Sequence, residues 1–497
     1  MTSSARAVLL LSTLAAVGAA ERHYTGPRGV AMAGANVASA NPMQAQTYNQ
    51  AVLGFLRWDQ ETNADQTQSA SENAEDWVVT SKYGMTADLS AGVQFQGDLQ
   101  PTLDAIQAAE ANLKEVEASG LSALETQSYI TLIERLAALE TNTLSVDGDA
   151  NLVVTGRRGN WALGGQLWFD TTGFVTDADL SNLALNTANA LAAGLNNNAA
   201  ELIKGDPNGY EISRLSSDQV ANLRNAGYSE DAVRALDSQL LGISPETQEK
   251  LVDAVAQLPL AELDSLADNQ TRVTLASLMV FEIPVSYGYA FNEYISVGGS
   301  LKAMYGVVGG REIQVFDPET SQLLFETGQN TTESFQGGLD LSLLARWEWL
   351  RAGLTGRNLN EPTFDSPELL GRATEDITID RNITTGIAID PLSWITTELS
   401  VDLVDYHRLN TRDDWQALAL AVELRPLKQL ALRGAYSTNI TSSEDRSEDE
   451  MITLGIGYTG STVQFELAAG LGTNTVTYDD ITVPTGARLS LGFGVAF

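Results

Sequence analysis

The chain has 497 residues and carries 64 acidic against 29 basic side chains, which gives a formal net charge of −35. A surface this acidic repels polyanions, so nucleic acid is not expected as a partner. Cysteine is absent, which excludes disulfides, thiol catalysis and cysteine-ligated metal sites, and histidine occurs only as His23 and His407. The mean hydropathy of −0.08 argues against a bundle of membrane helices.

Residues 1–20 have the pattern of an export signal. Arg6 precedes an apolar run, and small residues at 18–20 come before the charged Glu21. A first core helix is the alternative, but small residues flank the expected cleavage site and the run is too short to cross a bilayer. The remaining chain has no stretch of about 18 apolar residues. The exported protein is therefore expected to be either soluble beyond the inner membrane or a β-barrel.

Two helical insertions, at about 100–145 and 175–269, interrupt the predicted strands of the region 85–497. Within the first, residues 103–139 repeat apolar side chains at helical spacing. The second has helix start and stop signals, which are Ser216 with Gln219 as a capping box, Gly227 and Gly242 as stops, and Ser244 with Pro245 as N-cap and first-turn proline. The predicted strands around them are Met85 to Gln96, Asn151 to Arg157, Asn160 to Phe169 beyond the Arg158-Gly159 turn, and Val273 to Tyr287.

Alternation of apolar with small or polar residues fills roughly the last 230 residues. In the final segment Leu489, Leu491, Phe493, Val495 and Phe497 alternate with Ser, Gly and Ala. A soluble sandwich also alternates. Here the opposite face is rich in Gly and Ala with isolated charges, as in a polar lumen, and the strands are about ten residues long, which is the membrane-spanning length.

The connections between these strands alternate strictly between short and long. Reading back from Phe497, short turns at 459–461, 425–428, 390–393, 346–348 and 288–292 separate longer loops at 473–486, 438–450, 405–413, 357–381 and 307–336. Outer-membrane barrels alternate periplasmic turns with extracellular loops in this way. The sequence therefore predicts an all-β transmembrane barrel of about 14 antiparallel strands, with both termini in the periplasm and both helical insertions outside. A separate soluble helical domain or a lumen plug is the alternative for the insertions.

Three regions resemble the FadL-like group of outer-membrane fatty acid transporters, and most closely its branch labelled conjugal transfer TraF. They are residues 29–40, residues 338–364 and residues 416–439. Tyr48-Asn49-Gln50-Ala51 stands where the group has Asn-Pro-Ala. The resemblance implies a 14-stranded barrel with an amino-terminal hatch in its lumen, and it carries no catalytic signature.

A barrel of this size has a lumen wide enough for a ligand path, so it needs a plug to stay closed. Residues 21–84 are expected to form this hatch, with 29–55 as the plug itself, because small residues let the backbone pack against the wall. The candidate hatch residues are Gly29, Met32, Gly34, Asn36 and Asn49. A poorly ordered terminus is the alternative.

Alternation also predicts charged side chains that face the lumen, namely Lys302, Asp340, Arg346, Arg351, Glu398, Asp402, Glu423, Arg433, Glu466 and Arg488. Such groups pair across strands or line an aqueous path, and their mixed signs favour pairing. The last strand, with Phe493 and Phe497, is expected to close the barrel against the first, because unpaired edge groups in lipid cost several kcal/mol each. It is also the expected signal for the barrel assembly machinery.

Enzyme chemistry is not indicated. Ser400, Asp402, Asp405 and His407 are residue types of a hydrolase, but no Gly-x-Ser-x-Gly accompanies them and a lone histidine at the outer end of a strand is more often a loop residue. The acidic run at 442–450 lacks the spacing of a calcium loop and is interpreted as a solvated loop tip. The sequence predicts no enzyme, no cofactor and no metal.

Two functions from different classes remain. The first is passage or capture of a small hydrophobic ligand through a hatch-gated lumen, as the resemblance implies. The second is a non-transporting envelope scaffold, linked to conjugal transfer or surface interaction, in which the acidic helical insertions bind a partner. An apolar groove leading to a gap in the wall favours the first, and a lumen sealed by paired charges favours the second. Both readings place the chain in lipid, in the outer membrane of a Gram-negative bacterium.

Overall fold

The computed structural model describes most of the chain between residues 25 and 496. Outside the described residues lie 1–24, 64–82, 97–101, 103–105, 107–120, 140–142, 157–159, 176–177, 181–189, 244, 258–268, 315–329, 369–375, 408–413, 442–449, 461, 479–480 and 497. The predicted export signal, much of the predicted segment 21–84, the Arg158-Gly159 turn, the N-cap Ser244, the acidic run at 442–449 and the terminal Phe497 fall there. They stay predictions.

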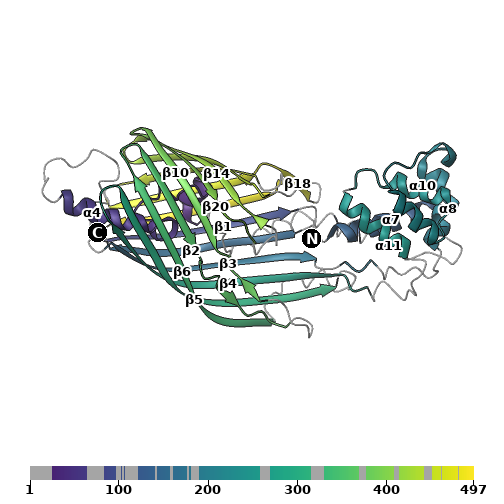
Figure 1. The fold of residues 1–497 in the computed structure, drawn as a ribbon, viewed down its shortest axis with the longest axis horizontal. Coiled ribbons are helices and arrows are strands. Elements are labelled where there is room, and N and C mark those ends of the chain that lie inside the picture. The colour runs from purple at the N-terminus through teal and green to yellow at the C-terminus, as the bar shows by residue number, and fades with distance from the viewer. Residues whose placement is uncertain are drawn as a thin grey trace.

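Within the described residues, 14 antiparallel strands form one closed barrel, in which β1 closes against β20 (Figure 1). The predicted strand number and antiparallel order are confirmed. Around the barrel the strands are β1 (Tyr83–Gln96), β2 (Thr143–Gly156), β3 (Trp161–Val175), β4 (Arg272–Ala290), β5 (Ile295–Gln314), β6 (Asn330–Arg346), β7 (Leu350–Arg357), β10 (Asn382–Leu392), β11 (Ile395–Asp402), β14 (Ala417–Leu427), β15 (Leu430–Asn439), β16 (Met451–Thr459), β17 (Val463–Gly472) and β20 (Gly486–Ala496).

The wall is taller over β2–β6 than the sequence predicts. β4 and β5 have 19 and 20 residues, whereas β7 and β11 have eight each. At about 3.3 Å per residue, 20 residues exceed a hydrocarbon core of about 30 Å even when the strand is tilted. Alternation marks only the lipid-facing part of a strand, because beyond the lipid both faces are free to be polar. The predicted strands therefore ended too early on this side.

The barrel is apolar outside and polar inside. Met279, Phe281 and Val285 on the outer face of β4 are between 39 % and 56 % exposed, while Glu282 and Ser286 on the inner face are buried. Exposed aromatic side chains surround the end that carries the short turns, among them Trp347, Trp349, Trp394, Tyr458 and Phe493. An outward apolar band with an aromatic girdle is the surface of a transmembrane barrel.

The two helical insertions pack into one domain beyond the opposite end of the barrel (Figure 1). Its helices among the described residues are α7 (Ala123–Leu139), α8 (Ala190–Ile203), the 3-10 helix η2 (Pro207–Gly209), α9 (Ser217–Asn225), α10 (Glu230–Gln239) and α11 (Pro245–Gln257). Leu132, Leu195 and Leu236 lie in its core, which reaches Val175 and Val273 at the ends of β3 and β4. The domain lies at the end with the long loops, which strand parity assigns to the extracellular side. Within the described part of the chain, no helix is long and apolar enough to cross a membrane.

Helix signals in the second insertion are confirmed. The Gln219 N–H donates to Ser216 Oγ at 3.2 Å and the Ser216 N–H donates to Gln219 Oε1 at 2.8 Å, which is the predicted capping box. Gly227 and Gly242 have φ of +96° and +87°, the left-handed conformation in which helices commonly end. Pro245 begins α11. These signals are local, so the sequence alone was enough to find them.

In the described parts of the long connections, where the sequence predicts only loops, the structure has three small sheets. They are β8 (Thr363–Phe364) with β9 (Ile377–Thr378), β12 (Tyr406–His407) with β13 (Asp414–Trp415), and β18 (Thr475–Tyr478) with β19 (Ile481–Pro484). Strands of two to four residues are too short for alternation to reveal.

Candidate functional site

Residues 25–63, here called the lumen segment, form α2 (Gly26–Ala31), α3 (Ala45–Tyr48) and α4 (Ala51–Asn63). The segment runs inside the barrel, and the end of α4 projects beyond the end that carries the short turns (Figure 1). Pro27 occupies the first turn of α2, where no N–H partner is needed. Gly34 bends the chain after α2 with a φ of +81°, a conformation that glycine adopts without strain. Nearly every residue from Thr25 to Phe55 is buried.

Glycines on both sides let α4 approach the wall. A Cβ on Gly298 of β5 would overlap the backbone of Gln50 and Ala51, and a Cβ on Gly288 of β4 would overlap the backbone of Gln50 and Gly54. Gly54 itself faces the backbone of β4 equally closely. The helix therefore rests on backbone rather than on side chains, a fit that no larger residue permits.

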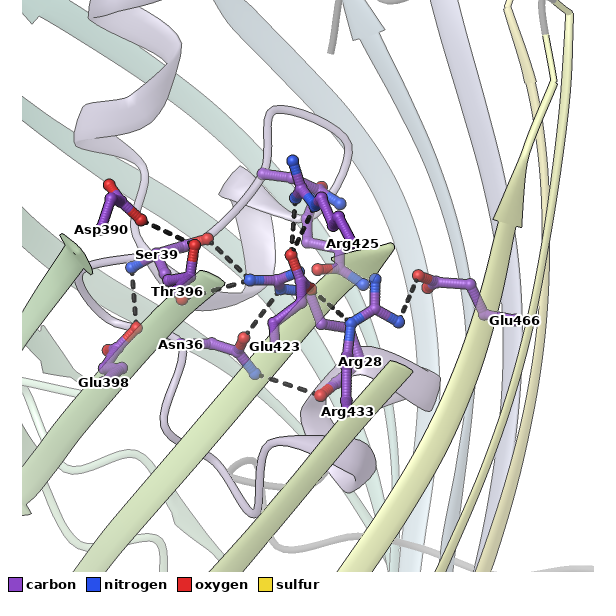
Figure 2. Close-up of polar contacts among 12 residues, drawn as sticks. Arg28, Asn36, Ser39, Asp390, Thr396, Glu398, Glu423, Arg425, Arg433 and Glu466 are labelled. Carbon is purple, nitrogen blue, oxygen red and sulfur yellow. Dashed lines mark hydrogen bonds and ion pairs between the residues drawn. The ribbon is translucent and has the colours of Figure 1, made fainter. Parts of the chain in front are cut away.

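Ion pairs fix the start of the lumen segment to β14–β17 (Figure 2). The fully buried Arg28 pairs with Glu423 of β14. Glu423 also binds Arg433 Nε of β15 at 2.5 Å and Arg425 at 2.7 Å, and Arg433 reaches Glu466 of β17 at 2.8 Å. Three guanidinium groups and two carboxylates thus share one network. Breaking a buried pair leaves a charge uncompensated, so this network holds α2 firmly.

Glu398 of β11 holds the next turn of the lumen segment through backbone groups. Its carboxylate accepts from the N–H groups of Ala38 and Ser39, each at 2.9 Å (Figure 2). Asn36 lies in the same turn and accepts from Arg28 Nε at 3.0 Å. The turn is therefore joined both to the wall and to the ion-pair network.

Asn49 fixes the start of α4. Its Nδ2 donates to the Val37 carbonyl at 2.7 Å, and its Oδ1 accepts from the Ala51 N–H at 3.0 Å. The Ala51 N–H also donates to Ser342 Oγ of β6 at 2.9 Å. An amide side chain can donate and accept at once, and this position uses both abilities.

The ladder between β3 and β4 is interrupted shortly after β3 begins, towards the end of the barrel that carries the short turns. It skips Gly164 and Gly165 and then resumes in the same register. Pro284 stands opposite Gly164 and has no N–H to donate to the ladder. A small cavity lined by Gln46, Gly164, Gly165, Glu282 and Pro284 lies at this interruption. The wall therefore lacks regular β3–β4 pairing at this point.

Gln46 of α3 covers the interruption from inside. Its Nε2 lies 3.2 Å from the Ala162 carbonyl, 3.0 Å from the Pro284 carbonyl and 3.1 Å from Ser286 Oγ. A Cβ on Gly164 would overlap the Gln46 side chain. The lumen segment thus meets this side of the wall through neutral hydrogen bonds, in contrast to the ion pairs at β14–β17.

Part of the lumen face of β3–β5 is apolar between this interruption and the helical domain, next to the buried polar residues Asp170 and Thr172 of β3. The buried residues of this apolar surface are Trp168, Leu278, Val280, Met304 and Val308, and Phe364 of β8 packs on them from the loop after β7. Polar residues bound it towards the interruption, where Trp168 Nε1 donates to Glu282 at 2.7 Å. The barrel interior is therefore not uniformly polar.

The predicted lumen charges are placed as follows. Eight are buried, namely Lys302, Asp340, Glu398, Asp402, Glu423, Arg433, Glu466 and Arg488. Besides the network described above, Lys302 binds Asp340 at 2.6 Å, Arg488 pairs with Asp147, and Asp402 accepts from Thr384 at 2.7 Å. Arg346 and Arg351 lie partly exposed near the turn end, paired with Asp59 at 2.5 Å and Asp390 at 2.8 Å.

The predicted hatch residues all lie in the lumen segment. Met32, Asn36 and Asn49 are fully buried, Gly29 is in α2, and Gly34 makes the bend after it. Phe493 of β20 faces outward and its ring lies 5.1 Å from that of Phe465.

The residues named for a hydrolase do not meet. His407 is 73 % exposed between Asp380 and Asp414, whereas Ser400 is buried on the lumen face and donates to Glu398 at 3.0 Å. Among the described residues, no group of three or more His, Asp or Glu is arranged to hold a metal ion.

Sequence reasoning missed Arg28 and Gln46, two of the residues through which the lumen segment contacts the wall. A signal for Arg28 was available, because it is the only charged residue between positions 25 and 56. A lone charge in such a stretch needs a buried partner. Gln46 has no comparable signal, since its partners are mostly backbone carbonyls.

Comparisons with known proteins identify the family of this chain. No curated protein sequence matches the chain. Three solved structures are similar at 10 % identity: the TodX monoaromatic hydrocarbon channel deltaS2 mutant (TM-score 0.44, 96 % of this chain and 100 % of that chain), a Pseudomonas aeruginosa FadL homologue (0.44, 97 % and 100 %) and the Ralstonia pickettii toluene transporter TbuX (0.39, 86 % and 93 %). TM-scores this low add nothing to the fold, which rests on the strand ladder.

Residues 69–402 match the sequence model described as F plasmid transfer operon, TraF, protein. The match runs from before β1 to the end of β11 and includes the TraF-like region at 338–364, while those at 29–40 and 416–439 lie outside it. Because it spans more than half of the chain, the protein belongs to this TraF family.

Proposed function

We propose that this chain is an outer-membrane barrel that passes or captures a small hydrophobic ligand, with the lumen segment acting as its hatch. The apolar surface on β3–β5, which leads to the ladder interruption at Gly164 and Gly165, carries the proposal. An apolar ligand needs such a lining. The lumen face around Glu423 and Arg433 is charged instead, so an apolar surface is not required merely to fill the barrel.

The outer face supports the location. Its exposed apolar side chains and the aromatic girdle at the turn end match a barrel in lipid. The short turns at one end and the long connections at the other match a periplasmic and an extracellular side. The helical domain then stands outside the cell, beyond the mouth of the lumen.

The hatch is held unequally on its two sides, which determines where it opens. Breaking the buried Arg28–Glu423 pair would cost about 3–5 kcal/mol. Each neutral hydrogen bond of Gln46 contributes only about 0.5–1.5 kcal/mol net. Local opening therefore begins at Gln46, beside the ladder interruption, while α2 remains fixed.

Gln46→Ala is expected to raise uptake of apolar solutes, because it removes the amide that covers the interruption. The measurement is uptake of radiolabelled toluene and of a radiolabelled long-chain fatty acid by Gram-negative host cells, in which the lipopolysaccharide leaflet limits entry of apolar solutes. The two probes separate a single-ring ligand from a long-chain ligand. Heat-modifiable migration on a gel shows that each variant is folded.

Gln50→Ala is the matched control. The Gln50 amide donates to the Gln46 carbonyl at 2.8 Å, within the hatch and not to the wall. Its uptake should equal that of the unchanged protein. Uptake that is the same for Gln46→Ala, Gln50→Ala and empty host cells would contradict the proposal.

A non-transporting scaffold is the second candidate, and one observation favours it. The helical domain has its own core and lies outside the barrel, while paired charges fix the lumen segment to β14–β17. A scaffold would retain its partner binding when Gln46 is changed and would show no uptake of either probe. The same uptake measurement therefore decides between the two candidates.

A further inference from the structure

Residues 358–368, here called the strap, leave the end of β7 and fold back into the outer half of the lumen. The strap begins with a tight turn, in which the Glu361 N–H donates to the Asn358 carbonyl at 2.8 Å. Asn358 and Glu361 both have a φ of +49°, although neither is glycine. Such a conformation costs energy and persists only where surrounding contacts impose it.

The strap replaces a missing neighbour of β6. β7 pairs with β6 only from Leu341 onwards, so the part of β6 before it has no partner from β7. The Leu359 N–H donates to the Leu339 carbonyl at 2.9 Å, and Asn360 both accepts from the Leu339 N–H at 2.9 Å and donates to the Gly337 carbonyl at 2.7 Å. The strap is thus held at the edge of β6 by polar contacts.

A charged pair positions the base of the strap. Lys302 Nζ lies 2.6 Å from Asp340 and 2.5 Å from Asn358 Oδ1, and the Asn358 N–H donates to Asp340 at 2.8 Å. This anchor is beside the apolar surface, on the side of the ladder interruption. It fixes where the strap starts and leaves its tip dependent on other contacts.

The tip places one aromatic ring on the apolar surface of β3–β5. Phe364 is fully buried in one hydrophobic cluster with Trp168, Leu278, Val280, Met304 and Val308. Its ring lies directly over Gly306, where any Cβ would overlap it. The surface is therefore shaped around a ring that comes from a loop and not from the wall.

We propose that this apolar surface is a ligand site and that Phe364 is its intramolecular occupant, displaced when an apolar group about the size of a benzyl group binds. The site deepens the function proposed above, because a ligand passing the lumen would meet it before the ladder interruption. A competing side chain lowers the apparent affinity by the fraction of molecules in which the strap is open. Its removal leaves a void lined mainly by apolar side chains, and cavities with such a lining bind benzene.

The test is binding of fluorobenzene, followed by ¹⁹F NMR, to the full barrel in lipid nanodiscs. Phe364→Ala should bind one fluorobenzene per barrel with an apparent Kd about tenfold lower than the unchanged protein. Phe335→Ala is the matched control, because Phe335 on β6 is 71 % exposed on the outer face. This variant accounts for fluorobenzene that partitions into lipid, and its apparent Kd should equal that of the unchanged protein.

Two further variants keep the proposal testable if Phe364→Ala folds poorly. Asn360→Ala loosens the strap at an exposed position, without touching the ring or the lining, and should lower the apparent Kd about fivefold. Adding Gly306→Leu to Phe364→Ala fills the void and should abolish the gain. Equal binding by the unchanged protein, Phe364→Ala and Asn360→Ala would overturn the proposal. Binding does not depend on uptake, so a site that binds in a barrel without uptake would refute transport and leave this site intact.

Discussion

Replacing Glu423 by Gln is expected to lower the stability of the barrel by about 3–5 kcal/mol. Glu423 is shared by Arg28, Arg425 and Arg433. With the carboxylate gone, three guanidinium groups would face Glu466 alone. The amide keeps the volume, so the loss reports charge and not packing. The measurement is the urea midpoint for loss of heat-modifiable migration in detergent.

Glu361→Gln is the control for that change. Glu361 makes a more exposed pair with Arg381 at 3.6 Å, and exposed pairs contribute only about 0–1 kcal/mol. A midpoint for Glu423→Gln no lower than that of Glu361→Gln would show that the ion-pair network does not hold the barrel and the lumen segment together.

Gly298→Val is expected to displace α4 from the wall. A Cβ at this position would overlap the backbone of Gln50 and Ala51, which cannot move aside as a flexible side chain would. Overpacking of this kind costs about 1–3 kcal/mol or forces the packed element to shift. The barrel itself should still fold, since Gly298 lies in a continuous ladder. Protease cleavage within the lumen segment, scored beside heat-modifiable migration, measures the displacement.

Gly337→Val is the matched control on the outer face. The nearest atom to a Cβ there is 3.9 Å away, so the side chain has room. Equal resistance of Gly298→Val and Gly337→Val to the protease would mean that α4 does not rest on β4 and β5 as described.

The barrel could be predicted from the sequence because the sequence patterns that specify it are local. Alternation along each strand and the parity of the connections need no knowledge of distant contacts, and both gave the 14-stranded order. The helix caps at Ser216 and Gly227 are local for the same reason. Strand length was underestimated over β2–β6, because alternation ends where the lipid ends.

The candidate site could not be predicted in the same way. Arg28 meets Glu423 across a separation of 395 residues, and alternation says which face a residue takes but not which partner it finds. Gln46 binds mostly to backbone carbonyls, which every residue carries. In the sequence, Pro284 indicates the ladder interruption, because proline has no N–H to donate to a neighbouring strand. Phe364 lies in a loop, where no regular spacing of apolar residues predicts which side chains it contacts.

The central claim is that the lumen segment closes the barrel, and single-channel recording in planar bilayers tests it most directly. Deleting residues 29–40 removes the turn held by Glu398 but leaves the ion pairs within the wall, which join Glu423 to Arg425 and Arg433. The unchanged protein should show little conductance, and the deletion should open a measurable channel in a barrel that still migrates as folded. The same conductance with and without residues 29–40, in two folded barrels, would show that this segment does not close the lumen and would contradict the account.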